Sequence, residues 1–447
     1  MPELTFDDLA FSRTTRSKRI FNPYLITPAP GQPIQGPLEF DIQDALNEQN
    51  NNRMEQEDRG EGYDSEEEAE LEDEDEDDYE ELATSVNAPC SSMPHPFASH
   101  HAPSPLSATS STPFSRGHWV SEIDVAKALG SSSGWIGRRR TFPRKHTSLA
   151  ELYTLGFKLL DSQLGETYPI VDRNRKIIGV FGAPSPEQSA TVVRDANAAL
   201  EQAHEQIYFT AKQKKNRRGD YPAAAYGISF GGGQRRPGIL KHSAKTAAIL
   251  QSLLKDLAFI SISDYNNSLL TTFAPRVHQY YSDGLTQLQE WNPRLVRNFP
   301  ETAFAACTWN FGPAAVSYPH TDNANVAFGW CSITALGDYN PDLGGHLVLW
   351  DLGLIIRFPP GATILIPSAL LVHSNVTIQE GEKRYAFVQY TAGGLFRWID
   401  HGFQSFEQWK KKNPLLAAKQ QYNRDRKARV QNGYNRFSTF SEIVGGS

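Results

Sequence analysis

The chain has 447 residues, and its formal net charge of −7 comes from 51 acidic and 44 basic side chains. This average hides two parts of opposite charge, because 18 of the acids lie between Glu55 and Glu81. Residues 82–447 carry 38 bases against 26 acids, a net charge of +12. A basic folded part favours polyanionic partners, with nucleic acid first.

Composition also excludes several classes of protein. No apolar run approaches the roughly 18 residues that a membrane-spanning helix needs, so we expect no membrane association. The start of the chain, MPELTFDDLA, has early acids and is followed by no apolar stretch of the kind found in secretory signals. Three cysteines (Cys90, Cys307 and Cys331) are too few and too scattered for a disulfide framework or a structural zinc site. We therefore expect a reducing compartment.

Residues 1–116 have the composition of a disordered region. The acidic block EEEAELEDEDEDDYEE and the tract CSSMPHPFASHHAPSPLSATSSTPFS contain too few apolar side chains to offset the entropy lost on ordering. Two roles fit the acidic run, which are shielding the basic part from non-specific DNA and recruiting a protein partner. Composition does not choose between them.

From His118 onward, hydrophobic periodicity predicts folded elements. Apolar residues at helical spacing predict helices at 147–164, 186–215, 242–257, 264–290 with a break at Pro275, and about 405–432. The run IVDRNRKIIGVFG at 170–182 predicts a hairpin, and seven short apolar or alternating runs after Pro300 predict a β-sandwich or barrel. We therefore expect a disordered 1–116, a mostly helical 117–300, a β core at 301–400 and a basic helical segment at 401–447.

One constellation of residues suggests metal chemistry. His320 and Asp322 are two residues apart, a spacing that puts both side chains on one face of an extended strand. His373 closes an apolar run 51 residues after Asp322, and Arg384 follows 11 residues later. Two histidines and one carboxylate leave three positions of a metal open, which suits non-haem Fe(II). An arginine beyond the metal suits the distal carboxylate of 2-oxoglutarate.

The surrounding segments also resemble a known family. HTDNAN, GWCSITALGD, GGHLVLWD, PPGATILIPS, HSN and RYAFVQYTAGG look like the catalytic core of TET/JBP-type 2-oxoglutarate oxygenases, especially the Tet-like set of basidiomycete fungi. The resemblance covers about 170–400 and includes GISFGGGQRRPG. It implies an α+β fold with a double-stranded β-helix (jelly-roll) core and packed helices. It also implies Fe(II) at His320, Asp322 and His373, with 2-oxoglutarate held by Arg384.

The same resemblance implies an activity, the oxidation of methyl groups on DNA bases. We expect 5-methylcytosine as the first substrate and N6-methyladenine as the second, with Asn325 contacting the base. The chain lacks the Cys-rich zinc region of the animal enzymes, and several of their base-contacting residues have no obvious equivalent. The identity of the base therefore stays open.

A methyl group inside duplex DNA cannot reach a buried metal, so the base must flip out of the helix. In the loop GGGQRR, Gly232 and Gly233 allow close backbone approach, and Arg235 and Arg236 supply charge for phosphates. Tyr318 is near enough to the ligands to line the cavity. Other basic clusters lie at 138–145 and 212–218, where DNA contact fits as well as a solvated face or a nuclear-import signal. A further basic stretch at 410–429 is expected to be an exposed helix.

Three alternatives remain beside this interpretation. A catalytically idle DNA-binding protein would keep the same fold as a scaffold. A hydroxylase of proteins or small molecules would use the same triad and arginine. A zinc-dependent cupin-like enzyme would have no evident use for Arg384. If DNA is the substrate, we expect a nuclear location.

Overall fold

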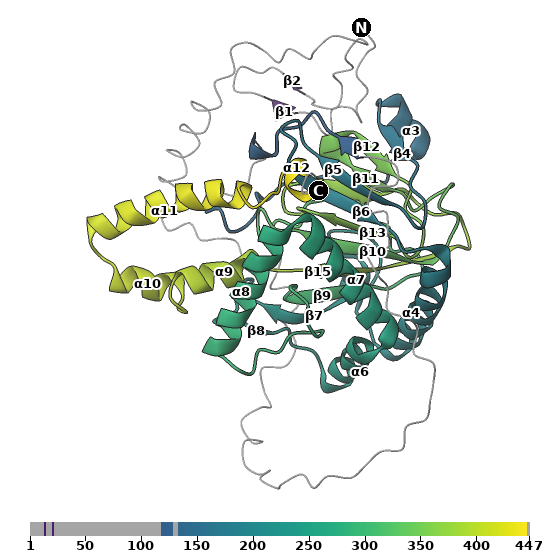
Figure 1. Cartoon of the computed structure of the whole chain (residues 1–447). Helices are drawn as coiled ribbons and strands as arrows, with labels where there is room; N and C mark the ends of the chain where they lie inside the picture. The colour runs from purple at the N-terminus through teal and green to yellow at the C-terminus, as the bar shows by residue number, and fades with distance from the viewer. Residues whose placement is uncertain (1–12, 15–19, 22–117, 128–132, 445–447) are drawn as a thin grey trace.

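The computed structural model describes residues 13–14, 20–21, 118–127 and 133–444 (Figure 1). Within the first 116 residues it describes only an antiparallel pair of two-residue strands, β1 (Arg13–Thr14) and β2 (Ile20–Phe21). The predicted disordered region otherwise lies outside the described residues.

Two β-sheets form the centre of the described structure (Figure 1). All neighbouring strands run antiparallel except the pairs β3–β5 and β4–β12, which are parallel. The larger sheet has nine strands in the order β3 (Trp119–Val120), β5 (Thr167–Val171), β6 (Ile177–Gly182), β13 (Thr363–Ile366), β10 (Cys331–Asp338), β15 (Lys383–Tyr390), β9 (Ala306–Asn310), β7 (Ala223–Ser229) and β8 (Gly238–Ile239). The smaller sheet has four, in the order β14 (His373–Asn375), β11 (Leu347–Leu349), β12 (Leu354–Ile356) and β4 (Lys158–Leu160).

The two faces of the smaller sheet follow the period of two that an extended backbone imposes. Leu347 and Leu349 on β11 join the main hydrophobic core together with the strands of the larger sheet. Val348, between them, points the other way and packs with Trp350 and Leu152 in a separate cluster. The smaller sheet therefore lies between the main core and a short outer layer.

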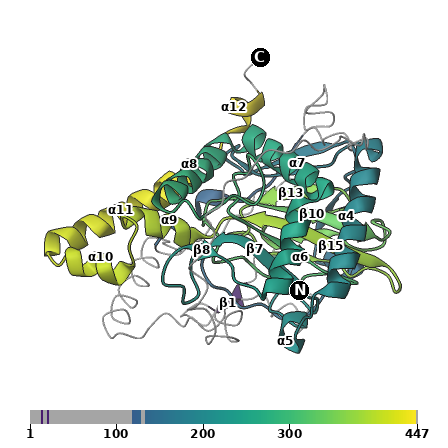
Figure 2. The same cartoon turned by 90° about the horizontal axis from the view of Figure 1, so that it is seen from below.

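Four long helices lie on one face of the larger sheet (Figures 1 and 2). They are α4 (Pro186–Gln206), α6 (Ala244–Lys255), α7 (Leu257–Phe273) and α8 (Pro275–Trp291). Ser185 begins α4 with a capping box that includes Gln188, and the Asp256 side chain accepts from the Ala258 amide at the start of α7. As predicted, the helical pattern breaks at Pro275, where α7 gives way to α8.

The remaining helices are shorter or lie towards the C-terminus. They are the 3₁₀ helices at Val125–Lys127 and Trp350–Leu352, α3 (Leu149–Thr154), α5 (Ala211–Lys214), α9 (Gly393–Asp400), α10 (Phe406–Lys412), α11 (Leu416–Tyr434) and α12 (Phe440–Val444). Among the described helices, none is alone long and apolar enough to cross a membrane. The consecutive helices α6 and α7 meet the criteria of length and composition only as a pair bent by 64°.

Two sequence predictions differ from the structure. The pattern at 147–164 forms a helix only at α3, because Gly156 adopts a left-handed φ of 85° and the chain continues as strand β4. The predicted hairpin at 170–182 does form, as β5 and β6, but it is not separate from the β core. β6 pairs with β13, and β7 pairs with β9, so the larger sheet takes strands from both sides of residue 300.

A buried polar network joins the helical layer to the sheet. The Asn266 amide nitrogen on α7 lies 3.1 Å from Ser332 Oγ, 3.2 Å from Thr334 Oγ1 and 3.1 Å from Gln389 Oε1. Gln389 in turn donates to Ser263 Oγ at 2.9 Å. These contacts show which side chains of β10 and β15 face the helices, and alternation turns their neighbours to the opposite face.

We predict that Asn266→Ala lowers the free energy of unfolding by about 2–3 kcal/mol, because it leaves buried hydroxyl and amide groups of the sheet without their shared partner. Chemical denaturation measures the change. Thr271→Ala, an exposed position on the same helix, is the matched control and should alter stability by less than about 0.5 kcal/mol. Equal effects of the two substitutions would contradict the role given to Asn266.

Candidate metal centre

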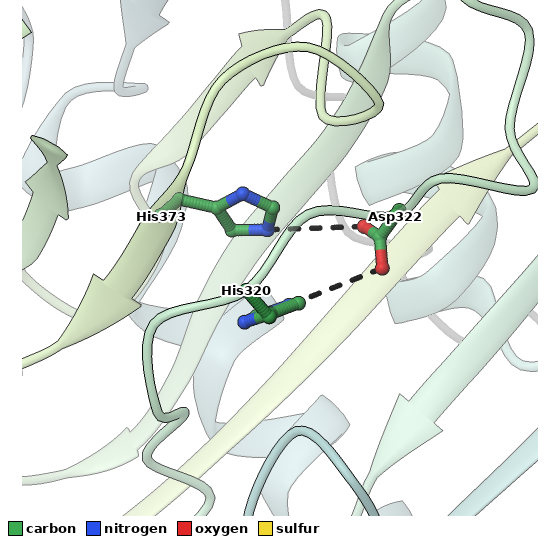
Figure 3. Close-up of side chains that lie close together, drawn as sticks. All are labelled: His320, Asp322 and His373. Atoms are coloured by element: carbon green, nitrogen blue, oxygen red, sulfur yellow. Dashed lines mark ion pairs between the residues drawn. The ribbon is translucent and has the colours of Figure 1, made fainter. Parts of the chain in front are cut away.

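The three predicted ligands come from two distant segments and meet in the structure (Figure 3). His320 and Asp322 lie in the loop between β9 and β10, and His373 begins β14. The backbone amide of each histidine donates to the carbonyl of the other, at 3.1 and 3.0 Å. The Asp322 amide donates to the Ser368 carbonyl at 2.9 Å, so the backbone fixes all three positions.

The ligand atoms surround one small space. Asp322 Oδ1 lies 3.9 Å from His320 Nε2, and Asp322 Oδ2 lies 3.8 Å from His373 Nε2. All three residues offer ligand atoms within 4.8 Å of one another. Nitrogen and oxygen donors bind a divalent transition metal at about 2.0–2.2 Å, so two ligands of one ion lie no more than about 4.3 Å apart. A slight closing of the side chains would therefore place one ion between them.

Both imidazole rings are oriented for metal binding. His320 Nδ1 lies 2.8 Å from the Tyr318 carbonyl, and His373 Nδ1 lies 3.0 Å from the Leu371 carbonyl. A carbonyl accepts only from a protonated nitrogen, so both rings carry their proton on Nδ1 and turn a free Nε2 towards Asp322.

Burial sets the charges of the three groups. It is the main cause that lowers the pKa of His320 and of His373, and the proximity of His373 lowers the pKa of His320 further, so both rings are neutral. Burial alone would raise the pKa of Asp322, but the Arg218 guanidinium and the two imidazoles outweigh it and hold this pKa far below its usual value. Two neutral imidazoles and one carboxylate are the protonation states that bind a metal.

Arg218 contacts the metal site, although the sequence predicted it as part of a basic cluster. Its Nε donates to Asp322 Oδ1 at 2.9 Å, and Arg217 donates to the Thr321 carbonyl at 3.1 Å. Both arginines were expected in a basic cluster on a solvated face or against DNA, and the structure instead turns them to the metal loop. The Arg218 side chain is 44% exposed, so it reaches Asp322 from the outer edge of the site.

Arg384 lies on the face of β15 that carries the metal centre. Its neighbours Tyr385 and Phe387 face the helices, where Tyr385 donates to Glu201 on α4 and Phe387 packs on Phe259 of α7. Alternation therefore turns Arg384 to the opposite face, as it turns Tyr390, whose pKa responds to Asp322. The Arg384 backbone also pairs with the segment that leads to His320, through hydrogen bonds to the Pro313 carbonyl and from the Ala315 amide.

The Arg384 side chain is only 1% exposed, yet most of its donors are unsatisfied. Nη1 donates to the Ala315 carbonyl, whereas Nε and Nη2 have no hydrogen-bond partner among the described residues. No ion pair with a carboxylate is recorded for it in the described part of the chain. A buried guanidinium is costly unless it is paired, so two orphaned donors indicate a site for an anion that accepts two hydrogen bonds.

Tyr221 lies near these groups and was not predicted from the sequence. Its hydroxyl lies 2.8 Å from Ser317 Oγ. Burial raises the pKa of Tyr221, while Arg218 and Arg384 both act to lower it, so the ring is within electrostatic range of both arginines. A single tyrosine in the run RRGDYP gives no signal by spacing, because its contacts come from chain segments far away in sequence.

Asn325 and Tyr318, which were predicted to bind the substrate, lie at different places around the metal loop. Asn325 follows the metal loop, where its backbone bridges to Ala392, and its side-chain amide donates to Ser368 Oγ at 3.1 Å. Tyr318 is partly buried, with its ring 4.4 Å from that of His146 and its hydroxyl donating to Asp220 at 3.0 Å. Tyr318 is thus fastened at the edge of the site, and its carbonyl orients His320.

The loop with Gly232, Gly233, Arg235 and Arg236 joins β7 to β8. Both glycines have left-handed φ values, 54° and 92°, which lets the chain turn sharply there. Arg235 and Arg236 are exposed. Phe230, just before the loop, packs against Gly394 and Trp398 of α9, whose N-terminus follows the residue that bridges to Asn325. The loop therefore attaches to the same helix that leaves the metal centre.

No protein-family model and no curated protein matches the chain. Among solved structures, NgTET1 in complex with 5mC DNA is similar at 17% identity and a TM-score of 0.40, over 53% of this chain and 82% of that chain. An oxidoreductase of the 2OG-Fe(II) oxygenase family from Burkholderia pseudomallei is similar at 14% identity and 0.27, over 48% and 84%. OsALKBH1 is similar at 11% and 0.26, over 48% and 96%.

The chain resembles such oxygenases in structure as well as in its motifs.

We predict that Asp322→Ala lowers the affinity for Mn(II), a spectroscopic substitute for Fe(II), by more than about a hundredfold, since even changes beyond the ligand shell cost about 10–100-fold. Calorimetric titration measures the affinity. Asp283→Ala removes an exposed carboxylate on α8 and should bind the ion as the unsubstituted protein does. Unchanged affinity in the Asp322 variant would refute the metal assignment.

Proposed function

We propose that this protein is an Fe(II)- and 2-oxoglutarate-dependent dioxygenase that oxidises methyl groups on DNA bases. The observation that carries the proposal is Arg384, a buried guanidinium with two unpaired donors on the same sheet face as a His-Asp-His triad. We interpret the two packed sheets as a double-stranded β-helix core.

The donor set favours iron over zinc. Two histidines and one carboxylate are the ligand set of non-haem Fe(II) sites, and they rule out a structural zinc site, which is closed by four protein ligands. Catalytic zinc also takes three protein ligands, so the buried Arg384 with its unpaired donors decides between the two metals. Fe(II) held there with 2-oxoglutarate would allow O2 to act as the oxidant of a C–H bond, with one oxygen atom going to the substrate and the other to the succinate formed, with CO2, from 2-oxoglutarate. A zinc hydrolase would need no buried arginine for a dicarboxylate.

The residues of the chain have separable roles in this proposal. His320, Asp322 and His373 hold one side of the ion, and the carbonyls that accept from each Nδ1 keep both rings in place. Arg384 grips the distal carboxylate of 2-oxoglutarate with two parallel hydrogen bonds. Arg218 keeps Asp322 ionised and fixes one of its oxygens. Tyr221 is buried within electrostatic range of both arginines and is fixed by its hydrogen bond with Ser317.

DNA is the proposed substrate because two independent features suit it. The motifs around the triad resemble those of enzymes that oxidise DNA methyl groups, and residues 82–447 carry a net charge of +12. The exposed Arg235 and Arg236 form a basic loop linked through α9 to the metal centre. We propose 5-methylcytosine first and N6-methyladenine second, a flipped base, Asn325 as a contact to that base and a nuclear location.

The deciding experiment incubates the protein with Fe(II), ascorbate, 2-oxoglutarate and duplex DNA that contains 5-methylcytosine, with a parallel duplex for N6-methyladenine. Mass spectrometry of the nucleosides should show hydroxymethyl or demethylated products, with one succinate formed for each oxidation. In Arg384→Lys, which keeps the charge and loses the bidentate grip, the KM for 2-oxoglutarate should rise at least about tenfold.

The control for that variant is Lys383→Ala, which removes the neighbouring exposed cation and should leave the KM unchanged. DNA that binds without any modified base would favour the idle DNA-binding protein and would overturn the proposed activity. An unaltered KM in Arg384→Lys would remove the assignment of 2-oxoglutarate to Arg384.

We also predict that Arg235→Ala/Arg236→Ala weakens binding to duplex DNA and reduces the slope of log K against log salt by up to about 2, since each phosphate contact contributes about 0.9. Fluorescence anisotropy over a range of salt concentrations measures both. Arg194→Ala/Lys255→Ala, which removes two exposed charges from the helical layer, should leave the slope unaltered. If the slope stays the same in the Arg235→Ala/Arg236→Ala variant, the basic loop does not contact DNA.

A further inference from the structure

We infer that the C-terminal helical hairpin, α10 with α11, is a second binding surface for the phosphate backbone of duplex DNA. It deepens the proposed function by naming a surface distant from the metal, and it rests on that function only in taking DNA as the polyanion. The hairpin lies to one side of the two sheets, away from α4 and α6, in both views (Figures 1 and 2).

Charge is the first observation. Between Phe406 and Tyr434 the sequence has eight basic residues and two acidic ones, a net charge of +6. The two acids are already engaged, because Glu407 pairs with Lys410 at 3.4 Å and Asp425 accepts from Gln421 at 2.6 Å. A helix that is simply solvated usually mixes both signs more evenly, so this excess of positive charge indicates an anionic partner. The exposed basic residues of the hairpin include Lys410, Lys411, Lys412, Arg424 and Lys427.

The second observation is that the base of the hairpin is held rigidly. Trp409 and Tyr422 pack together with ring centroids 5.2 Å apart, and both rings lie beside His401. Arg429 stacks 3.6 Å from the Trp135 ring and pairs with Asp400 at 3.1 Å. The aromatic residues of the hairpin therefore pack at its attachment, and its exposed surface carries the lysines.

Arg429 is therefore part of this attachment, and we do not include it in the proposed DNA-binding surface. Arg429 also donates to the Ser133 carbonyl at 2.7 Å. The Trp135 indole nitrogen donates to the same Asp400 carboxylate at 2.7 Å. Arg429 closes the attachment, whereas Arg424 and Lys427, five and two residues before it on α11, are exposed.

The third observation is the position of the hairpin relative to the metal centre. α9 begins at Gly393, directly after the bridge between Asn325 and Ala392, and ends at Asp400 in the attachment of the hairpin. Eight helical residues span about 12 Å. The basic loop at 231–237 is held to the same helix, where Phe230 packs on Trp398 with ring centroids 5.1 Å apart.

The length of the hairpin suits a duplex. α11 has 19 residues and is about 28 Å long, the rise of about eight base pairs at 3.4 Å each. A helix of this length can lie beside the phosphate backbone over most of one helical turn of roughly 34 Å.

The test measures binding of the full chain to an unmethylated 24-base-pair DNA duplex by fluorescence anisotropy from low to high salt. In Arg424→Ala/Lys427→Ala, we expect the salt slope to fall by up to about 2 and affinity at 150 mM salt to drop at least about fivefold. Alanine is the strongest helix former, so the melting temperature should stay unchanged. Lys410→Ala/Lys411→Ala/Lys412→Ala should show the same direction of change.

Arg194→Ala/Lys255→Ala is the matched control, because it also removes two exposed charges but from the helical layer on α4 and α6. An unaltered slope in both hairpin variants, or an equal loss in the control, would overturn the inference. Tighter binding of an RNA duplex of equal length would overturn the choice of DNA. Hairpin-dependent DNA binding without any base oxidation would support the inference while the proposed activity failed.

Discussion

The reciprocal backbone pairing of His320 with His373 is the constraint on which the site depends. Two hydrogen bonds, at 3.1 and 3.0 Å, join a loop after β9 to the start of β14 across more than fifty residues of chain. Each histidine then uses the carbonyl two residues before it to fix its own Nδ1. The backbone thus orients both rings before any ion binds, and the entropy of arranging the ligands is lost during folding rather than on metal binding.

The side chains around this pair of histidines carry an excess of positive charge, which suits a dianionic ligand. Asp322 is the carboxylate of the triad, whereas Arg217, Arg218 and Arg384 bring three positive charges to its surroundings. Both imidazoles are neutral because burial disfavours their charged forms. A divalent metal would add further positive charge. A ligand with two carboxylates offsets this excess, and one carboxylate can meet the unpaired donors of Arg384.

The sequence predicted those residues that belong to a short motif or follow one another at a regular spacing. The H-x-D pair, the histidine that closes an apolar run and Arg384 were predicted from their spacing, although His320 and Asp322 lie in a loop and not on a regular strand. Pro275 marks the break between α7 and α8 as expected. Arg218 and Tyr221 could not be found in this way, because their partners Asp322 and Ser317 lie about a hundred residues away. In KNRRGDYP a basic cluster looks the same whether it faces solvent or a buried carboxylate.

The sequence predicted a division near residue 300 between a helical part and a β core, and the structure does not show it for a similar reason. Periodicity identifies β5 and β6 as a hairpin but carries no information on which sheet they join, and that choice is made by pairing with β13. Once they join, the larger sheet presents one face to α7, through Asn266, and the other to the metal centre. α9 leaves this second face at the bridge between Asn325 and Ala392 and ends in the attachment of the hairpin. One short helix therefore connects the loop that carries the metal ligands to the hairpin, so the positions of the two are fixed relative to each other by α9.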